Sequence, residues 1–499
     1  MERLYRAIFF WILVVIFIIA APSMVFYAKG YRFDLSRGVF VHSGTISIKS
    51  NPQDIRISLN DKENDSKTLD RMNNSFKIPG LLPNTYNLSV SADGYQTWSK
   101  KVEVHSGQAS EFWNILLVKN EYTKTDYNTP AIEKIFISPK SKYIIYTQKN
   151  DNNNLGVNIL NIKDKQIVNT FNFPTWKFIN DENRENIEWS PEEDYISVPV
   201  MQENKNSTTD KNSIAYNYFI INPNDNSSFN LNNHLNNQNI NYVRWDPKDK
   251  NYLFYLSNNN LYRSNITNNL DTTLIAENVS SFDLSKTNVY YAIRPHELVY
   301  KENLNGSDEP IQITSDFPED ISKNFRLIAY DDARIAFLTK NKDFYIFNAG
   351  EFDSYFRKLG ADIEGIQFSD DGKKLLYWTK NSMSVYYLRN WNVSPVRSEN
   401  TIEDITRYSD EIKNIQWFKD YEHIIFSIGS QMKIIELDPL DHRNSMDLSK
   451  TNSDTPLVSY NHYLEKLFFI DTKDSSTNLY SIILPEPTPI LGIYTPPAE

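Results

Sequence analysis

The residue types that most often carry catalysis or metal binding are sparse and scattered in this chain of 499 residues. The absence of cysteine removes thiol nucleophiles, disulfides and thiolate metal sites together. No Gly-x-Ser-x-Gly turn, phosphate-binding loop or dinucleotide fingerprint occurs. No two histidines have the short spacing that places a pair on one metal ion, so we interpret each as a solvated or turn histidine: His42, His105, His234, His296, His423, His442 and His462. The sequence therefore predicts no catalytic residue, no metal ligand and no cofactor.

One acidic stretch, Ser369-Asp370-Asp371-Gly372, is similar to a fragment of a calcium-binding loop. It falls at the turn of a repeated sequence unit. We therefore interpret it as a hairpin turn.

That repeated unit occurs eight times between Ile135 and Phe469, as an apolar strand, a turn of about six residues and a second apolar strand. Ser-Pro, Asp-Pro or Asp-Gly occupies several of the turns, where proline and glycine favour the required backbone angles. The copies are 38 to 56 residues apart and start at Ile137, Trp189, Trp245, Asp283, Ala329, Phe368, Trp417 and Tyr460. A period of about 40 to 50 residues is typical of propeller blades.

We therefore predict an all-β chain whose residues 120–485 form a β-propeller of eight four-stranded blades. The copy at Ala329 is weak, so seven blades is the alternative. The last copy lacks a fourth strand, and we expect the segment around 121–127 to supply it and close the ring.

Polar residues stand immediately before the residue that begins four of the copies: Glu188, Arg244, Gln367 and Gln416. Because side chains alternate along a strand, they point away from the aromatic residues that follow them. They are our candidates for binding groups that face the channel, and hydrogen bonding between blades is the alternative. We interpret the aromatic residues themselves (Trp189, Trp245, Phe368 and Trp417) as packing between blades. Function is then expected in the irregular stretches, the longest of which follows Trp189.

Residues 7–27 contain no charge and would form a helix of roughly 31 Å, long enough to span a bilayer. A cleavable signal peptide is the competitor, but the apolar stretch is longer than usual and Ala20-Ala21-Pro22 is a poor cleavage site. Basic residues flank both ends of the stretch. Because a short N-terminal tail usually stays inside, we expect a single-pass anchor over residues 1–30 in the cytoplasmic membrane. The bulk of the chain would then be extracytoplasmic.

After an expected linker at residues 31–43, short alternating strands fill residues 44–119. Three stretches, Gly44 to Pro52, Leu82 to Leu88 and Gly94-Tyr95, resemble the PEGA domain family of small β-sandwiches. The family's Gly-Ala after proline is replaced here, because Gln53-Asp54-Ile55 follows Pro52. The resemblance implies a stalk or adhesive module of a bacterial envelope protein, without catalysis. Tyr95 and Trp98 are candidates for an exposed glycan platform, with packing on the sandwich as the alternative.

Charge separates the classes of partner. The net charge is −11, and because residues 1–40 carry +3, the remainder carries −14. An acidic body without a basic stripe argues against nucleic acid. We interpret the proline-rich residues 486–499 as a tail. The repeat also resembles the propellers of the Tol system, which is a likeness of architecture alone.

Three functions follow as hypotheses. The first is a non-enzymatic, membrane-anchored envelope protein whose propeller is a binding or scaffold platform for protein or glycan. The second is a propeller-based polysaccharide lyase or hydrolase, which predicts two carboxylates, or a carboxylate with tyrosine or histidine, at one channel mouth. The third is a purely structural envelope attachment protein. The sequence leaves the oligomeric state open.

Overall fold

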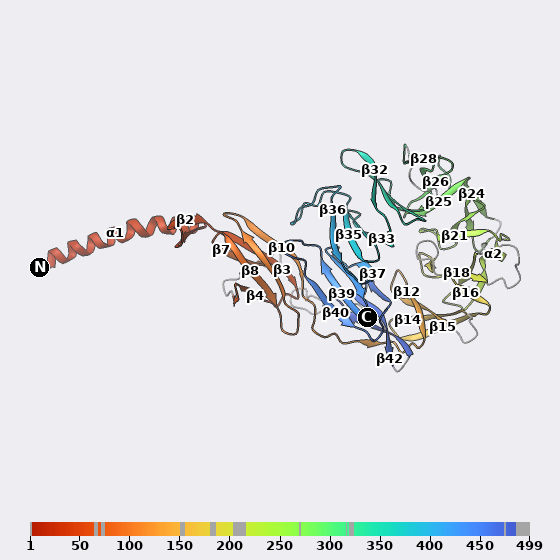
Figure 1. Ribbon diagram of the computed structural model, residues 1–499, viewed down its shortest axis with the longest axis horizontal. Coiled ribbons are helices and arrows are strands. Elements are labelled where there is room, and N and C mark those ends of the chain that lie inside the picture. Colours follow the sequence, from red (N-terminus) through yellow and green to blue (C-terminus); the bar gives the residue numbers. More distant parts are fainter. Residues whose placement is uncertain are drawn as a thin grey trace.

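The computed structural model describes residues 2–63, 68–70, 75–149, 155–179, 186–202, 216–268, 271–315, 317–318, 324–473 and 476–485. The expected tail at 486–499 lies outside these residues. Along the chain, a helix leads through a hairpin into a small sandwich, and the sandwich contacts a ring of sheets (Figure 1).

The N-terminal helix α1 (Glu2–Ala28) is long and apolar enough to cross a membrane, and it lies apart from the rest of the molecule. The segment that we expected to be a plain linker contains a two-stranded hairpin, β1 (Tyr31–Asp34) and β2 (Val39–His42). Phe33 lies opposite Phe40 in this hairpin. Alternating Tyr31, Phe33, Phe40 and His42 give the pair one aromatic face.

Two four-stranded sheets form the small sandwich, in the orders β10-β3-β7-β6 and β5-β4-β8-β9. Their strands are β3 (Gly44–Asn51), β4 (Arg56–Leu59), β5 (Lys62–Glu63), β6 (Thr68–Asp70), β7 (Ser75–Leu81), β8 (Asn84–Ser91), β9 (Trp98–Val104) and β10 (Ala109–Leu116). Every second residue of β9 is buried, as period-two alternation requires of a strand with one face on a core.

Eight further sheets form the ring within the described residues, so the eight-blade prediction is confirmed. Blade 1 consists of β12 (Ile132–Ile137), β13 (Tyr143–Lys149), β14 (Leu155–Asn161) and β15 (Gln166–Phe173). Blade 2 consists of β16 (Trp176–Phe178), β17 (Glu188–Trp189), β18 (Ile196–Gln202), β19 (Tyr216–Ile221) and β20 (Ser228–Asn230), followed by the short helix α2 (Leu231–His234). Blade 3 consists of β21 (Ile240–Trp245), β22 (Tyr252–Ser257), β23 (Asn260–Asn265) and β24 (Thr272–Ala276), and blade 4 of β25 (Val279–Leu284), β26 (Asn288–Ile293), β27 (Leu298–Asn303) and β28 (Ile311–Gln312).

Blade 5 consists of β29 (Phe325–Asp331), β30 (Arg334–Thr339), β31 (Phe344–Ala349) and β32 (Ser354–Gly360), and blade 6 of β33 (Gly365–Phe368), β34 (Lys374–Trp378), β35 (Ser382–Tyr387) and β36 (Ile402–Arg407). Blade 7 consists of β37 (Ile412–Trp417), β38 (His423–Ile428), β39 (Gln431–Glu436) and β40 (Ser445–Lys450). Blade 8 consists of β41 (Val458–Asn461), β42 (Lys466–Lys473), β43 (Ser476–Ile483) and β11 (Thr125–Asp126). The weak copy at Ala329 is a full blade, because its β29 and β30 pair with β31 and β32.

The ring closes through the segment that we expected to supply the missing strand. Strand β11 pairs with β43, with Thr125 opposite Ser481 and Asp126 opposite Tyr480. The next residue, Tyr127, is buried, and its hydroxyl is hydrogen-bonded to Ser481 Oγ at 3.2 Å. The two strands of this closure thus come from opposite ends of the propeller sequence.

Apolar packing holds the blades side by side. Among the described residues, each boundary between neighbouring blades contains its own buried apolar cluster, and the cluster between blades 7 and 8 continues into the core of the sandwich. The aromatic residues that begin the repeats belong to these clusters: Trp417 is fully buried and its indole Nε1 donates to Gln367 O of the preceding blade at 3.0 Å. Trp245 makes the same bond to Glu188 O at 3.2 Å.

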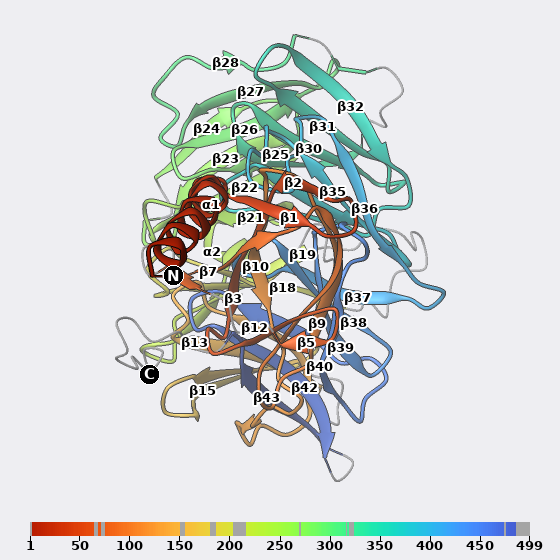
Figure 2. The ribbon, with the colours of Figure 1, turned by 90° about the vertical axis from the view of Figure 1, so that its left-hand side faces the viewer.

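The ring has two unlike faces. On one face lie the connections from first to second strands and from third to fourth strands of each blade. The sandwich contacts blade 7 on this face, so we call it the docked face. The far face carries the turns from second to third strands and the loops between blades. Seen from the helix end, the sandwich lies in front of the ring (Figure 2).

Candidate functional site

The four candidates from the repeat lie on first strands and connect neighbouring blades. Gln367 Oε1 accepts a hydrogen bond from Trp417 N at 3.0 Å, and Gln416 Oε1 accepts one from Tyr460 N at 2.7 Å. Glu188 Oε2 accepts from Trp245 N at 3.4 Å in the same way. Hydrogen bonding between blades, the alternative that we considered, therefore accounts for these three.

Arg244 extends this pattern with charge. Its Nε lies 2.5 Å from Glu188 Oε1 in blade 2, and its Nη1 lies 2.5 Å from Asp283 Oδ1 in blade 4. Asp283 Oδ2 accepts from Ala329 N of blade 5 at 2.9 Å. Burial raises the pKa of the Glu188 carboxyl, and Arg244 offsets this only in part. All four oxygens of the two carboxylates thus face donors of the fold itself, which is an arrangement for joining blades.

The pair expected as an exposed aromatic platform is not one. Trp98 is buried, and its Nε1 donates to Glu436 Oε2 of blade 7 at 2.8 Å. Tyr95 is half-buried and forms an isolated β-bridge with Lys119. Trp98 faces inward because it shares the buried side of β9 with Val102 and Val104, so packing on the sandwich, the alternative to a glycan platform, is confirmed for this residue.

Trp98 marks a joint between the sandwich and blade 7 whose centre is a buried lysine. Lys100 Nζ lies 2.9 Å from Glu436 Oε1 and donates to three carbonyl oxygens of the loop after β39: Asp438 O, Leu440 O and His442 O, at 2.9, 3.0 and 2.9 Å. Its side chain has no exposed surface. A charged group removed from water is tolerated only with such complete pairing. This joint therefore fixes the sandwich to the docked face.

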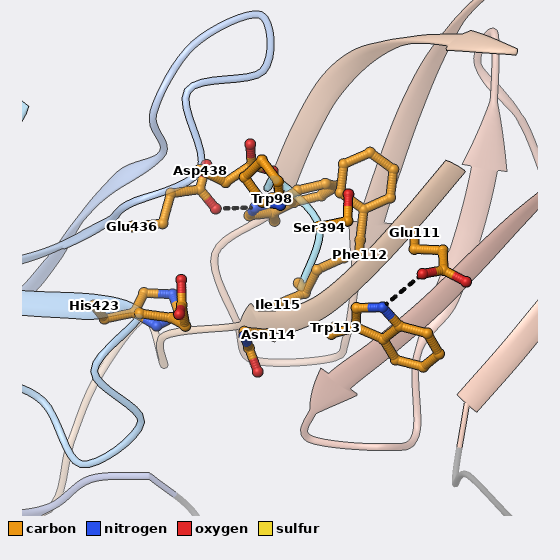
Figure 3. A pocket seen from close by; sticks show the side chains of 12 residues that line it. Trp98, Glu111, Phe112, Trp113, Asn114, Ile115, Ser394, His423, Glu436 and Asp438 are labelled. Atoms are coloured by element: carbon orange, nitrogen blue, oxygen red, sulfur yellow. Dashed lines mark hydrogen bonds between the residues drawn. The ribbon is translucent and has the colours of Figure 1, made fainter. Parts of the chain in front are cut away.

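His423 lies at the same joint, which corrects our expectation of a solvated or turn histidine. It is buried, and its Nδ1 lies 2.8 Å from Asp420 Oδ2. Burial lowers the pKa of the imidazole, but Asp420, Glu436 and Glu422 outweigh this and raise the pKa overall. Trp98, His423 and Glu436 border a cavity of about 30 Å³ (Figure 3). That space holds about two water molecules and no larger ligand.

A larger hollow opens on the far face, where residues of blades 2, 3 and 4 and the start of blade 5 come together. Its volume is about 270 Å³, and it is lined by Tyr216, Asn241, Tyr242, Leu256, Asn258, Asn259, Val279, Ser280, Arg294 and Asn324. We call it the far-face pocket. Side-chain amides and phenols dominate the lining, and each can both donate and accept hydrogen bonds. Sequence analysis missed it because its residues come from unaligned turns and strand starts.

The pocket also contains an unusual backbone conformation. Tyr242 has φ of 54° at a bulge in β21, and Asn258 and Asn259 in the next turn have φ of 50° and 63°. Asparagine tolerates this left-handed region, whereas a bulky side chain such as tyrosine rarely occupies it. Backbone outliers of this kind collect at functional sites. Tyr242 is thus the residue that most distinguishes this pocket.

Metal chemistry finds no support in the described residues, where no group of three or more His, Asp or Glu side chains is placed to hold an ion. The Ser369–Gly372 stretch is a hairpin turn, closed by a bond from Gly372 N to Ser369 O at 2.8 Å. Of the long irregular stretch after Trp189, residues 203–215 lie outside the described part of the chain.

Comparison with known proteins places the chain at the level of fold. No family model matches the sequence, and no curated protein matches it. Among solved structures, the chain is similar to the C-terminal WD40 domain of Sif2, with 11% identity, a TM-score of 0.44, and coverage of 73% of this chain and 98% of that one. It is also similar to dipeptidyl peptidase 4 of Porphyromonas gingivalis, with 9% identity, a TM-score of 0.44, and coverage of 71% and 58%.

Proposed function

We propose that this protein is a non-enzymatic, membrane-anchored binding platform of the bacterial envelope, with the far face of its propeller as the binding surface. The observation that carries the proposal is the joint at Lys100. It ties the sandwich to the docked face of blade 7, so the far face and its pocket point away from the sandwich and the helix.

The anchor and the stalk agree with this arrangement. Helix α1 has the length and hydropathy of a membrane span. The sandwich has two four-stranded sheets, and a small β-sandwich is the fold that the resemblance to PEGA domains implies. We place the N-terminus in the cytoplasm and the propeller outside it, because a short N-terminal tail usually stays inside.

A glycan fits the far-face pocket better than a protein surface does. The pocket is concave and small, its lining has amides and phenols from Asn241, Asn324 and Tyr216, and among the described lining residues Arg294 is the sole formal charge. Neutral polyhydroxylated ligands need such paired donors and acceptors. Catalysis is not part of the proposal, since Glu188 and Asp283 are both held by Arg244 and the main chain.

The test uses the full chain in detergent on an array of bacterial envelope glycans, beside the variants Asn241→Leu and Asn341→Leu. Asn241 lines the pocket, whereas Asn341 is an exposed far-face residue in the turn after β30 and serves as the matched control. We expect hits that Asn241→Leu abolishes and Asn341→Leu retains. Hits that ignore both changes would place binding elsewhere. An array without hits, together with a protein that membrane cross-linking captures reproducibly, would favour a protein partner. If neither a glycan nor a protein is found, the structural role would be favoured.

Topology has a separate test that uses the absence of cysteine. The variant Asn341→Cys has a single thiol on the far face. We expect a membrane-impermeant maleimide to label it in intact spheroplasts as fully as after lysis. Labelling only after lysis would contradict an extracytoplasmic propeller.

A further inference from the structure

The hairpin between helix and sandwich carries apolar side chains that the fold leaves in solvent. Phe33 and Phe40 are each 47% exposed, and Leu35 at the turn is 88% exposed. Large apolar side chains gathered on one exposed face mark an interaction surface. This surface lies directly after the apolar helix.

Ring contacts make the hairpin continuous with the end of α1. The ring of Phe26 in the helix stacks on Phe40 at 5.5 Å and meets Tyr31 edge-on at 5.6 Å. Arg32 lies 3.7 Å over the ring of Tyr27, and its Nη1 donates to Tyr27 O at 3.1 Å. The aromatic face of the hairpin therefore extends the apolar surface of the helix sideways.

The other end of the hairpin is tied to the sandwich. Ser106 Oγ of the sandwich donates to His42 O at 3.0 Å, and Ser43 Oγ donates to Gly30 O at 2.6 Å and closes the base of the hairpin. Because both ends are held, the position of the hairpin relative to the helix is set by the fold.

Basic residues border this surface. Lys29 and Arg37 are exposed, and the one acidic residue of the hairpin, Asp34, is buried in the turn, where Ser36 N and Ser36 Oγ donate to its Oδ1. Arg37 Nε lies 3.5 Å from Asp34 Oδ2, and 63% of the Arg37 side chain remains exposed. Basic groups beside a membrane span attract anionic lipids, and aromatic rings concentrate at the level of the headgroups.

We propose that hairpin 31–42 lies in the membrane interface, with Phe33, Leu35 and Phe40 at the boundary of the acyl chains and Lys29 and Arg37 on the phosphates of anionic phospholipids. This inference rests on the proposed membrane anchor. It adds a second contact with the bilayer, so the sandwich and ring are held at a set tilt.

The test reconstitutes the full chain in vesicles of phosphatidylcholine, with and without phosphatidylglycerol, after labelling a single introduced cysteine with an environment-sensitive dye. Leu35→Cys reports on the hairpin and Asn341→Cys is the control on the far face. Interfacial elements lie about 5–10 Å into the headgroup boundary, so we expect iodide to quench the Leu35 label at least about threefold less than the control. Nitroxide-bearing lipids should quench the Leu35 label alone.

A charge arm completes the test. In the Leu35→Cys background, Lys29→Gln with Arg37→Gln should abolish the increase in lipid quenching that phosphatidylglycerol produces. Equal iodide quenching of the two labels, in a chain that floats with the vesicles, would overturn the inference. Protection from both quenchers would overturn it too, because it would indicate a protein contact. A chain that fails to float would instead refute the anchor.

Discussion

Blades 3 and 7 share one backbone and put it to different uses. Both first strands carry a bulge at the third residue, where Tyr242 and Asn414 each have φ of 54°. Asn414 donates to Ser427 Oγ at 2.7 Å and to Pro456 O at 2.8 Å, and accepts from Val458 N at 3.2 Å. Tyr242 instead lines the far-face pocket.

The two blades differ in what the side chain at the bulge contacts. Blade 7 uses its polar side chains to bind its neighbour and the sandwich, so that region is closed and rigid. Blade 3 keeps the same main-chain shape but has the phenol of Tyr242 where blade 7 has the amide of Asn414. A hollow thus lies where the repeat retains its geometry and changes its chemistry.

The largest effect is expected from a substitution that weakens the joint between the sandwich and blade 7. Lys100→Met leaves the buried Glu436 and the half-buried Asp438 without their cation, and breaking a buried pair costs about 3–5 kcal/mol. We expect a lower melting temperature in calorimetry and faster hydrogen exchange in β9 and β40. Lys101→Met, at the exposed neighbouring position, is the control, and equal effects of the two changes would refute the buried lysine as the centre of the joint.

Next in size is an exchange of the two bulge residues. Asn414→Tyr should lose three hydrogen bonds and force a bulky residue into the left-handed region, which we expect to cost about 2–4 kcal/mol. Urea unfolding followed by tryptophan fluorescence measures the loss. A cost below that of a surface change such as Asn341→Tyr would show that the bonds of Asn414 contribute little.

The joint should also respond to pH. The pKa of His423 is raised in the folded protein, so its stabilising pairing with Asp420 is fully present below the unfolded pKa of about 6.5 and is lost as pH rises through the folded value. Burial likewise raises the pKa of Glu422, which acts in the same direction. We expect the melting temperature of the native chain, relative to that of His423→Gln, to fall between pH 6 and pH 9. A constant difference would contradict this assignment.

The smallest effect is expected for Tyr242→Asn. Relief of backbone strain and loss of aromatic packing oppose one another, so stability should change by less than about 1 kcal/mol. Binding on the glycan array should nevertheless fall, because Tyr242 lines the pocket. Retained binding would remove this residue from the site.

Much of the architecture could be predicted from the sequence, because each copy of the repeat corresponds to one blade. Turn residues and apolar strands at a blade-like period predicted eight blades, including the weak copy at Ala329, and the incomplete last copy pointed to closure by 121–127. These features are local, so a single sequence contains them. The hairpin at 31–42 was missed because its four-residue strands are too short to show a period.

The joint was harder to foresee because its partners are more than 330 residues apart in sequence. One signal was nevertheless present: Lys100 occupies an inward position of β9 between Trp98 and Val102. A lysine on the apolar side of a strand predicts a buried partner. The far-face pocket left no such signal, because it forms only when turns and strand starts of four blades come together.

The pairing of β11 with β43 also sets an order of events during synthesis. Tyr127 and Ser481 meet across 354 residues, so β11, which is made first, lacks its partner β43 until nearly the whole propeller has been made. Contacts of such long range form late, and an unpaired strand edge is a site of aggregation until they do. The nascent chain therefore spends most of its synthesis with an unsealed ring, and the interval before closure is the period when its unpaired strand edges favour aggregation.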